Sequence, residues 1–104
     1  MSMKTMGPAA GVGALFLFGA SGLALAYTGE NLARQAKVTI EQARAIALKA
    51  HPGKITDEEL EQEKGGSGLR YSFDIKDGRK TFEVGVDAQT GKLLENAAEG
   101  PNPD

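Results

Sequence analysis

Two alternating segments on either side of an Asp-Gly pair constrain the fold of this chain more than any other feature. Both segments carry large apolar side chains at every second position: Leu69, Tyr71, Phe73 and Ile75 before the pair, and Phe82, Val84 and Val86 after it. This alternation is typical of strands with one buried face, and an Asp-Gly pair favours a two-residue type I′ turn. A turn centred on Asp77-Gly78 predicts a hairpin in which each large apolar residue faces another. The predicted pairs are Phe73 with Phe82, Tyr71 with Val84, and Leu69 with Val86.

A helix is predicted over residues 40–51, before the hairpin. Thr39 and Gln42 have the spacing of a capping box, in which each side chain bonds the backbone amide of the other residue. Apolar residues then recur at the spacing of one helix face: Ile40, Ala43, Ile46, Ala47 and Ala50. Pro52-Gly53 should end the helix, because the residue before a proline is disfavoured in the helical conformation.

An acidic strand is predicted over Lys54 to Glu63. Its apolar residues, Ile55 and Leu60, are five positions apart, so a bulge is needed to turn both toward the core. Dense charge is typical of an edge strand that resists pairing with other chains. We consider three interpretations of the run from Asp57 to Glu63: a solvated edge, a surface for a basic partner, or a metal site. The run lacks the Asp/Asn-Gly spacing of a calcium loop, which disfavours the metal.

A second turn and a short strand should complete the domain. The Asp87 carboxylate can accept hydrogen bonds from amides two or three residues later, and Gly91 can adopt the positive φ of a bulged turn. Residues 92–95 then return as a strand, and residues 96–104 are predicted to form a flexible tail. Residues 27–38, ahead of the helix, have weak helical character and form either an ordered leader or a simple tether. The domain proper is thus expected over residues 39–95.

The N-terminus has the pattern of a signal peptide. Lys4 is followed by an uncharged, largely apolar segment that ends in Ala24-Leu25-Ala26, the small-x-small pattern of a cleavage site. We predict a signal over residues 1–26, with cleavage after Ala26, and hence a periplasmic or extracellular protein. The alternative is retention of residues 7–26 as a membrane anchor. Losing Lys4 changes the net charge from −2 to −3. An acidic chain without a basic stripe is not expected to bind nucleic acid.

Read together, these segments resemble the PepSY domain. The resemblance rests on these residues, in this order: Thr39-Ile40-Glu41-Gln42-Ala43, Ile46-Ala47-Leu48, Pro52-Gly53-Lys54, Glu59-Leu60-Glu61, Tyr71, Asp77-Gly78, and Val86-Asp87-Ala88-Gln89-Thr90-Gly91-Lys92-Leu93. It covers residues 39–95 and implies an α+β fold: one N-terminal helix packed on a three- to four-stranded antiparallel sheet, in the order α-β-β-β-β. It also implies a role in binding and restraining peptidases.

Catalytic chemistry has few candidate residues in this sequence. The chain has no cysteine, so disulfides and cysteine-bound metals are excluded, and no cofactor is expected. His51 is the single histidine and falls at the end of the predicted helix, where a capping or surface role is expected. Ser67 lies in a glycine-rich turn, and Ser72 lies on the outer face of a predicted strand. We therefore do not expect an enzyme.

Our hypothesis from the sequence is an exported, non-catalytic protein-binding module, with peptidase inhibition or regulation as its most specific form. The alternative is an extracytoplasmic accessory subunit of a membrane reductase or sensor protein. Two groups of charged residues are the candidate partner surface: Asp57, Glu59, Glu61 and Glu63 in the acidic strand, and Lys76, Arg79 and Lys80 at the hairpin tip. No catalytic or metal-binding residue is assigned.

Overall fold

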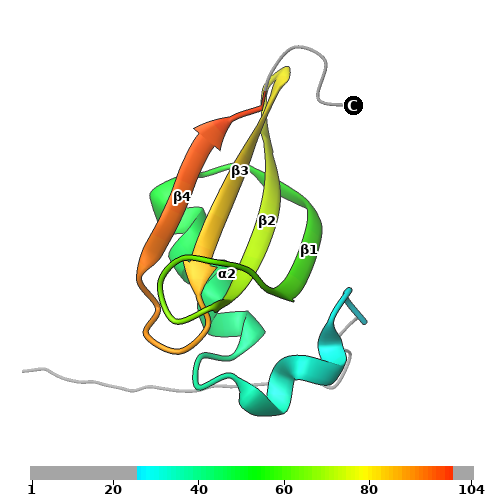
Figure 1. Cartoon of the computed structure of the whole chain (residues 1–104). Helices are drawn as coiled ribbons and strands as arrows, with labels where there is room; N and C mark the ends of the chain where they lie inside the picture. The colour runs from blue at the N-terminus through cyan, green and yellow to red at the C-terminus, as the bar shows by residue number, and fades with distance from the viewer. Residues whose placement is uncertain (1–25, 100–104) are drawn as a thin grey trace, which may run out of the picture.

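The fold is one α-helix packed on a four-stranded antiparallel sheet (Figure 1), in a computed structural model that describes residues 26–99. The elements are η2 (Glu30–Gln35, a 3-10 helix), α2 (Ile40–Ala50), β1 (Lys54–Gln62), β2 (Leu69–Asp77), β3 (Lys80–Asp87) and β4 (Leu93–Ala98). The strands lie in the sheet in chain order, β1-β2-β3-β4. The predicted α+β class and element order are confirmed. Residues 1–25 of the predicted signal peptide lie outside the described residues.

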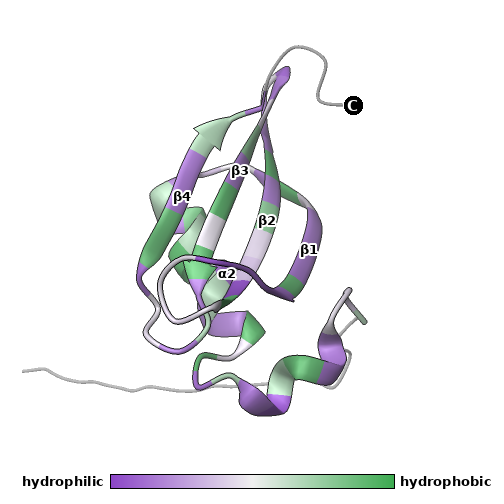
Figure 2. Cartoon of the chain, viewed as in Figure 1, coloured by the Kyte–Doolittle hydropathy of each residue, from purple (hydrophilic) through white to green (hydrophobic). Residues whose placement is uncertain are grey.

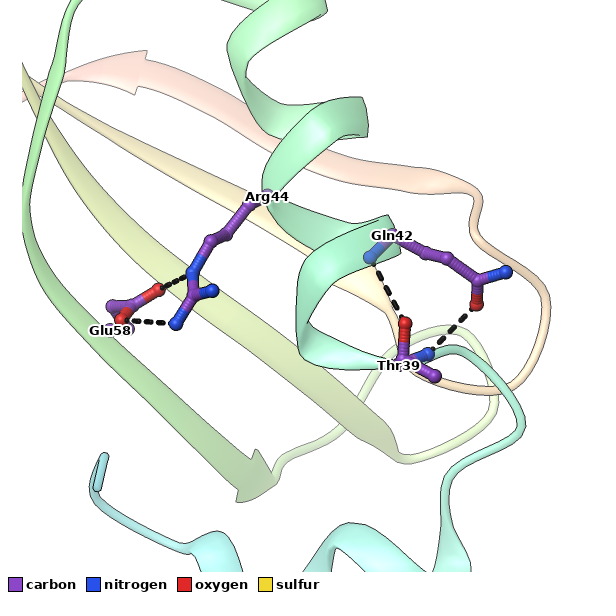
Figure 3. A network of polar contacts seen from close by, with 4 residues as sticks. All are labelled: Thr39, Gln42, Arg44 and Glu58. Atoms are coloured by element: carbon purple, nitrogen blue, oxygen red, sulfur yellow. Dashed lines mark hydrogen bonds and ion pairs between the residues drawn. The ribbon is translucent and has the colours of Figure 1, made fainter. Parts of the chain in front are cut away.

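Helix α2 begins where its sequence predicts and ends one residue earlier, at Ala50. The Thr39 hydroxyl accepts from the Gln42 amide at 3.1 Å, and the Thr39 amide donates to the Gln42 side chain at 2.9 Å (Figure 3). His51 is the C-cap, and its amide donates to the Ala47 carbonyl. Ala43 and Ala47 are fully buried, and side chains this small let the helix lie close to the sheet.

The core lies between α2 and one face of the sheet (Figure 2). Its largest buried side chains come from the three strands β1, β2 and β3: Leu60, Tyr71, Phe73, Ile75, Val84 and Val86. The Tyr71 hydroxyl is satisfied by the Val38 carbonyl at 2.7 Å, just before the helix. The alternating pattern of the hairpin therefore predicted the buried face correctly.

The predicted register of that hairpin was wrong by two positions: each residue of β2 pairs with a residue of β3 two positions later than predicted. Phe73 lies opposite Val84 and Ile75 opposite Phe82, because the turn is centred on Gly78-Arg79 and Asp77 pairs with Lys80. Gly78 has φ +68° and is the first central residue of the turn, where type I′ and II′ turns both require positive φ. A slip of two positions keeps every side chain on its own face, so the apolar pattern cannot distinguish the two registers.

Strand β1 is an edge strand with the predicted bulge. The pairing with β2 shifts between Ile55 and Asp57, which lets Ile55 and Leu60 lie on the same side of the sheet. The leader also proves to be ordered against this edge. Thr28 forms a parallel bridge with Glu59, and the Leu60 amide donates to the Thr28 carbonyl at 2.8 Å.

Strand β4 is longer than predicted. It runs to Ala98, which pairs with Phe82, so residues 96–98 belong to the sheet and not to a tail. The reason is the length of β3, whose outer edge offers backbone partners as far as Thr81. Few large apolar residues mark this segment, because only one of its faces meets the helix.

Candidate partner-binding surface

The two faces of the sheet differ in what covers them. Helix α2 packs on one face, and the opposite face, called the open face below, is not covered by any element that the structure describes (Figure 1). Side chains alternate along a strand, so the residues between the core positions point to the open face. These residues are largely polar and acidic, and the middle of β1 is drawn in purple in Figure 2.

The acidic run of β1 is divided between the two faces. Glu58 lies on the helix side, where its carboxylate forms two hydrogen bonds with the Arg44 guanidinium, at 2.6 and 3.0 Å (Figure 3). Hydrogen bonding to Glu58 is the main reason that the pKa of Arg44 is raised. Asp57, Glu59 and Glu61 alternate with Glu58 and Leu60 and point to the open face.

Glu59 and Glu61 are neighbouring carboxyl groups of the open face whose pKa values shift in opposite directions. A side-chain hydrogen bond with Glu61, followed by partial burial and the Glu61 charge, raises the pKa of Glu59 to about 7. The same hydrogen bond lowers the pKa of Glu61, which also accepts from the Ser72 hydroxyl at 2.8 Å. Ionisation of Glu61 therefore disfavours ionisation of Glu59, and Glu59 is the group whose pKa is raised.

A row of three carboxylates crosses the open face. Asp57 of β1 lies directly opposite Asp74 of β2, which lies directly opposite Glu83 of β3. Burial, followed by the negative charge of Glu95 and Asp74, raises the pKa of Glu83. Asp74, Glu83 and Glu95 are not among the surface residues predicted from the sequence. The apolar alternation of the hairpin already places Asp74 and Glu83 at outward positions, but only the observed register places them opposite each other.

Arg70 is the buried cation of the open face. It is only 7% exposed, and its guanidinium donates to the Glu95 carboxylate at 3.3 Å and to the Lys64 carbonyl at 3.2 Å. Its Nε has no hydrogen-bond partner among the described residues. Arg70 therefore ties the loop after β1 to β4 and neutralises one end of the acidic face.

The buried carboxylate of Asp87 joins two loops at one end of the sheet. Its carboxylate accepts from the Gln89 amide at 2.8 Å and the Thr90 amide at 3.1 Å, as predicted. It also accepts from the Ser67 amide at 2.7 Å and the Ser67 hydroxyl at 2.9 Å, which the sequence did not indicate. Burial raises the pKa of Asp87, but these hydrogen bonds outweigh it and hold the pKa at about 2. Ser67 is thus a partner of a structural carboxylate.

The three predicted basic residues lie apart from this acidic centre. Lys76, Arg79 and Lys80 are exposed at the β2–β3 tip, at the end of the sheet where β1 begins. Glu63 follows β1 at the other end and is also exposed, and a side-chain hydrogen bond with it contributes to the lowered pKa of Glu61. The structure therefore does not bring the seven predicted residues together. Of these seven, Asp57, Glu59 and Glu61 share the open face.

His51 is engaged in packing rather than presented to solvent. Its ring stacks on Phe82 with 3.8 Å between centroids, and Nε2 lies 3.1 Å from the Asp77 carboxylate. The predicted capping role is confirmed by the helix end. Among residues 26–99, no group of three or more His, Cys, Asp or Glu residues is arranged to hold a metal ion.

Comparison with known proteins decides the family. The profile described as "Peptidase propeptide and YPEB domain" (PepSY) matches residues 37–96, more than half of the chain. The chain belongs to the PepSY family. This domain type occurs in exported proteins and is generally non-catalytic. Comparisons with curated proteins and with solved structures gave no significant match. Within the described PepSY domain and its leader, no helix has the length and apolar character needed to cross a membrane.

Proposed function

We propose that this chain is an exported, non-catalytic PepSY module that regulates a protein partner, with a peptidase as the preferred partner class. The open face of the sheet, centred on Asp57, Glu59, Glu61, Asp74 and Glu83, is the contact surface. The family supports a peptidase-associated role. The partner surface is supported by the distribution of charge on the sheet.

The observation that carries this proposal is the carboxylate row Asp57–Asp74–Glu83. Like charges directly opposite each other on neighbouring strands destabilise a sheet, by up to about 1 kcal/mol for a pair. Glu59 and Glu61 are a second pair of neighbouring carboxyl groups beside the row, and the charge of Glu61 contributes to the raised pKa of Glu59. A surface that lowers the stability of its own fold is typical of a functional site, because selection for binding opposes selection for stability.

The mechanism that follows is non-covalent and electrostatic. The twisted sheet holds its carboxylates at fixed spacings, and this arrangement matches lysine and arginine side chains on a partner. Opposite charges would accelerate association and orient the two proteins, and binding would weaken as the salt concentration rises. A bound partner would also relieve the repulsion within the row, so part of the lost stability returns on binding.

Residues 27–104 are the form to test, since every core residue that the structure describes lies between Tyr27 and Ala88. The mature domain should inhibit a peptidase exported by the same cell. The triple variant Glu59→Gln/Glu61→Gln/Glu83→Gln should weaken inhibition at least tenfold. Glu41→Gln, an exposed change on helix α2, should not. Full peptidase activity with excess domain, for every co-exported peptidase, would refute the inhibitor form. Association with a membrane reductase or sensor protein instead would make the chain an accessory subunit.

Export is proposed on the N-terminal pattern, with cleavage after Ala26. The intact mass of the native protein measures this directly. A mass that begins at Tyr27 supports cleavage, and a mass that retains residues 7–26 means that the protein keeps this segment as an anchor.

A further inference from the structure

A groove lies beside the edge of β1, between the leader and the bulge. Its volume is about 560 Å³. The lining comes from the start of the leader and the first half of the strand: Ala26, Tyr27, Thr28, Ile55, Thr56, Asp57 and Glu58. Ala26 and Tyr27 both line the groove, so the peptide bond that joins them lies at its wall.

The leader is fixed at this place by contacts on both sides of the groove. Thr28 bridges to Glu59 on the strand edge, and Gly29 approaches the Leu60 backbone with φ +85°, a conformation that favours glycine. The Tyr27 ring packs near the buried Tyr71 ring, with 6.5 Å between centroids. The backbone of Tyr27 therefore has a defined position at the rim of the groove.

The charges around Tyr27 are mostly negative. The ionised groups that surround it are Glu30 from η2, Glu41 and Arg44 from α2, and Asp57 and Glu58 from β1. The phenol responds to this environment: burial, followed by the negative charge of Glu30 and Glu41, raises the pKa of Tyr27. The Arg44 guanidinium is bound to Glu58 at 2.6 Å, and no ion pair of Asp57 is found within residues 26–99. A positive group at the backbone of Tyr27 would thus be stabilised.

We propose that this groove is the binding site of the α-ammonium group that signal-peptide cleavage creates on Tyr27. The proposal rests on cleavage after Ala26. Hydrolysis by a signal peptidase adds one water across the Ala26–Tyr27 bond, so Ala26 leaves as a carboxylate and Tyr27 keeps an amine, which is protonated at neutral pH. The ammonium group then lies beside Asp57, which is its principal counter-charge.

This assignment makes cleavage a step that completes the fold. The bound ammonium holds the leader against the edge of β1, and it is absent from the precursor because residue 27 is then in a peptide bond. The edge that the acidic residues already protect is then also closed by the chain's own N-terminus. The mature protein is therefore more stable than a form whose N-terminus is blocked.

The test uses the mature chain, which is short enough for chemical synthesis, with a free or an acetylated α-amine on Tyr27. At pH 6 the free amine should raise the melting temperature by about 3 °C over the acetylated form, a shift that corresponds to a fraction of a kcal/mol for a domain of this size. A bound ammonium has a raised pKa, so its stabilisation is complete below about pH 7.7 and is lost as the pH rises. The difference between the two forms should therefore disappear by about pH 10.

Asp57→Asn should remove most of the pH 6 difference between the free and acetylated forms. Glu63→Gln makes the same charge change beyond the far end of β1 and should leave the difference intact. Equal melting temperatures of the two forms at pH 6 would overturn the proposal, as would an acetylation effect that Asp57→Asn does not reduce. The synthetic chain begins at Tyr27 regardless of cleavage in the cell. It also needs no partner, so its result is independent of the proposed function.

Discussion

Asp87 shows how one residue can serve both a local turn and the global fold. Its carboxylate is 2% exposed and accepts hydrogen bonds from Ser67, Gln89 and Thr90. These bonds join the loop after β1 to the turn before β4. A buried carboxylate that accepts several hydrogen bonds is stable only in its charged form, so the fold depends on its ionisation.

At the scale of this residue, we predict an acid-dependent loss of stability. The pKa of Asp87 is about 2 in the fold, against an ordinary value of 3.8. Since the pKa is depressed on folding, the stabilisation is present above about pH 4 and is lost as the pH falls through 2. It amounts to about 2 kcal/mol. Urea denaturation from pH 7 to pH 2 measures it.

The variant Asp87→Asn should lose about 2 kcal/mol of unfolding free energy at pH 7 and should show a flatter acid limb. The exposed Glu63→Gln is the control and should keep the acid limb of the natural protein. If Asp87→Asn and the natural protein lost the same stability between pH 5 and pH 2, Asp87 would not be the titrating group.

Among the elements, the hairpin explains where sequence-based prediction succeeded and where it failed. Alternation of apolar residues predicted both strands and their buried face, because successive side chains of a strand point to opposite faces of the sheet. Register is decided by the whole sheet: the observed pairs place Ile75 opposite Phe82 and use Gly78 as the first turn residue. An even slip leaves the apolar pattern unchanged, so no local signal could identify it.

In the other elements too, features set by neighbouring residues were predictable and features set by strand pairing were not. The capping box at Thr39 and the bulge after Ile55 were predictable, because each depends on residues near each other in the sequence. The open face was predictable only in β1. Asp74 and Glu83 become part of it through strand pairing. The leader was not predictable either, because it joins the edge of β1 through Thr28, whose partner Glu59 is distant in the sequence.

The register leads to a prediction about Asp74, which lies between Asp57 and Glu83. Asp74→Lys replaces two repulsive contacts with two attractive ones, and it should raise the unfolding free energy by about 1 kcal/mol at pH 7. Chemical denaturation measures the change, and 1 M NaCl should reduce it.

The control is Glu63→Lys, which makes the same change of net charge outside the row. Equal gains from the two variants would mean that net charge, and not the row, limits stability. In the predicted register Asp74 would face Thr81, so absence of a gain from Asp74→Lys would argue against the observed pairing.

In the whole molecule, one side of the sheet supports the fold and the other carries the function that we propose. Helix α2 and the core residues stabilise the first side, and the carboxylate row destabilises the second. The same four strands serve both sides, because side chains alternate along each strand. This division allows the open face to change its charge without repacking the core, which suits a module that recognises partners.

The most direct test of the open face as the partner surface is a crosslinked pull-down from the native envelope, with three tagged full-length forms compared by mass spectrometry. These are the natural protein, the face variant Glu59→Gln/Glu61→Gln/Glu83→Gln, and the tip variant Lys76→Ala/Arg79→Ala/Lys80→Ala. We predict that the natural protein and the tip variant recover the same partner, and that the face variant recovers at least tenfold less of it. Undiminished recovery by the face variant, with loss of the partner by the tip variant, would contradict the account.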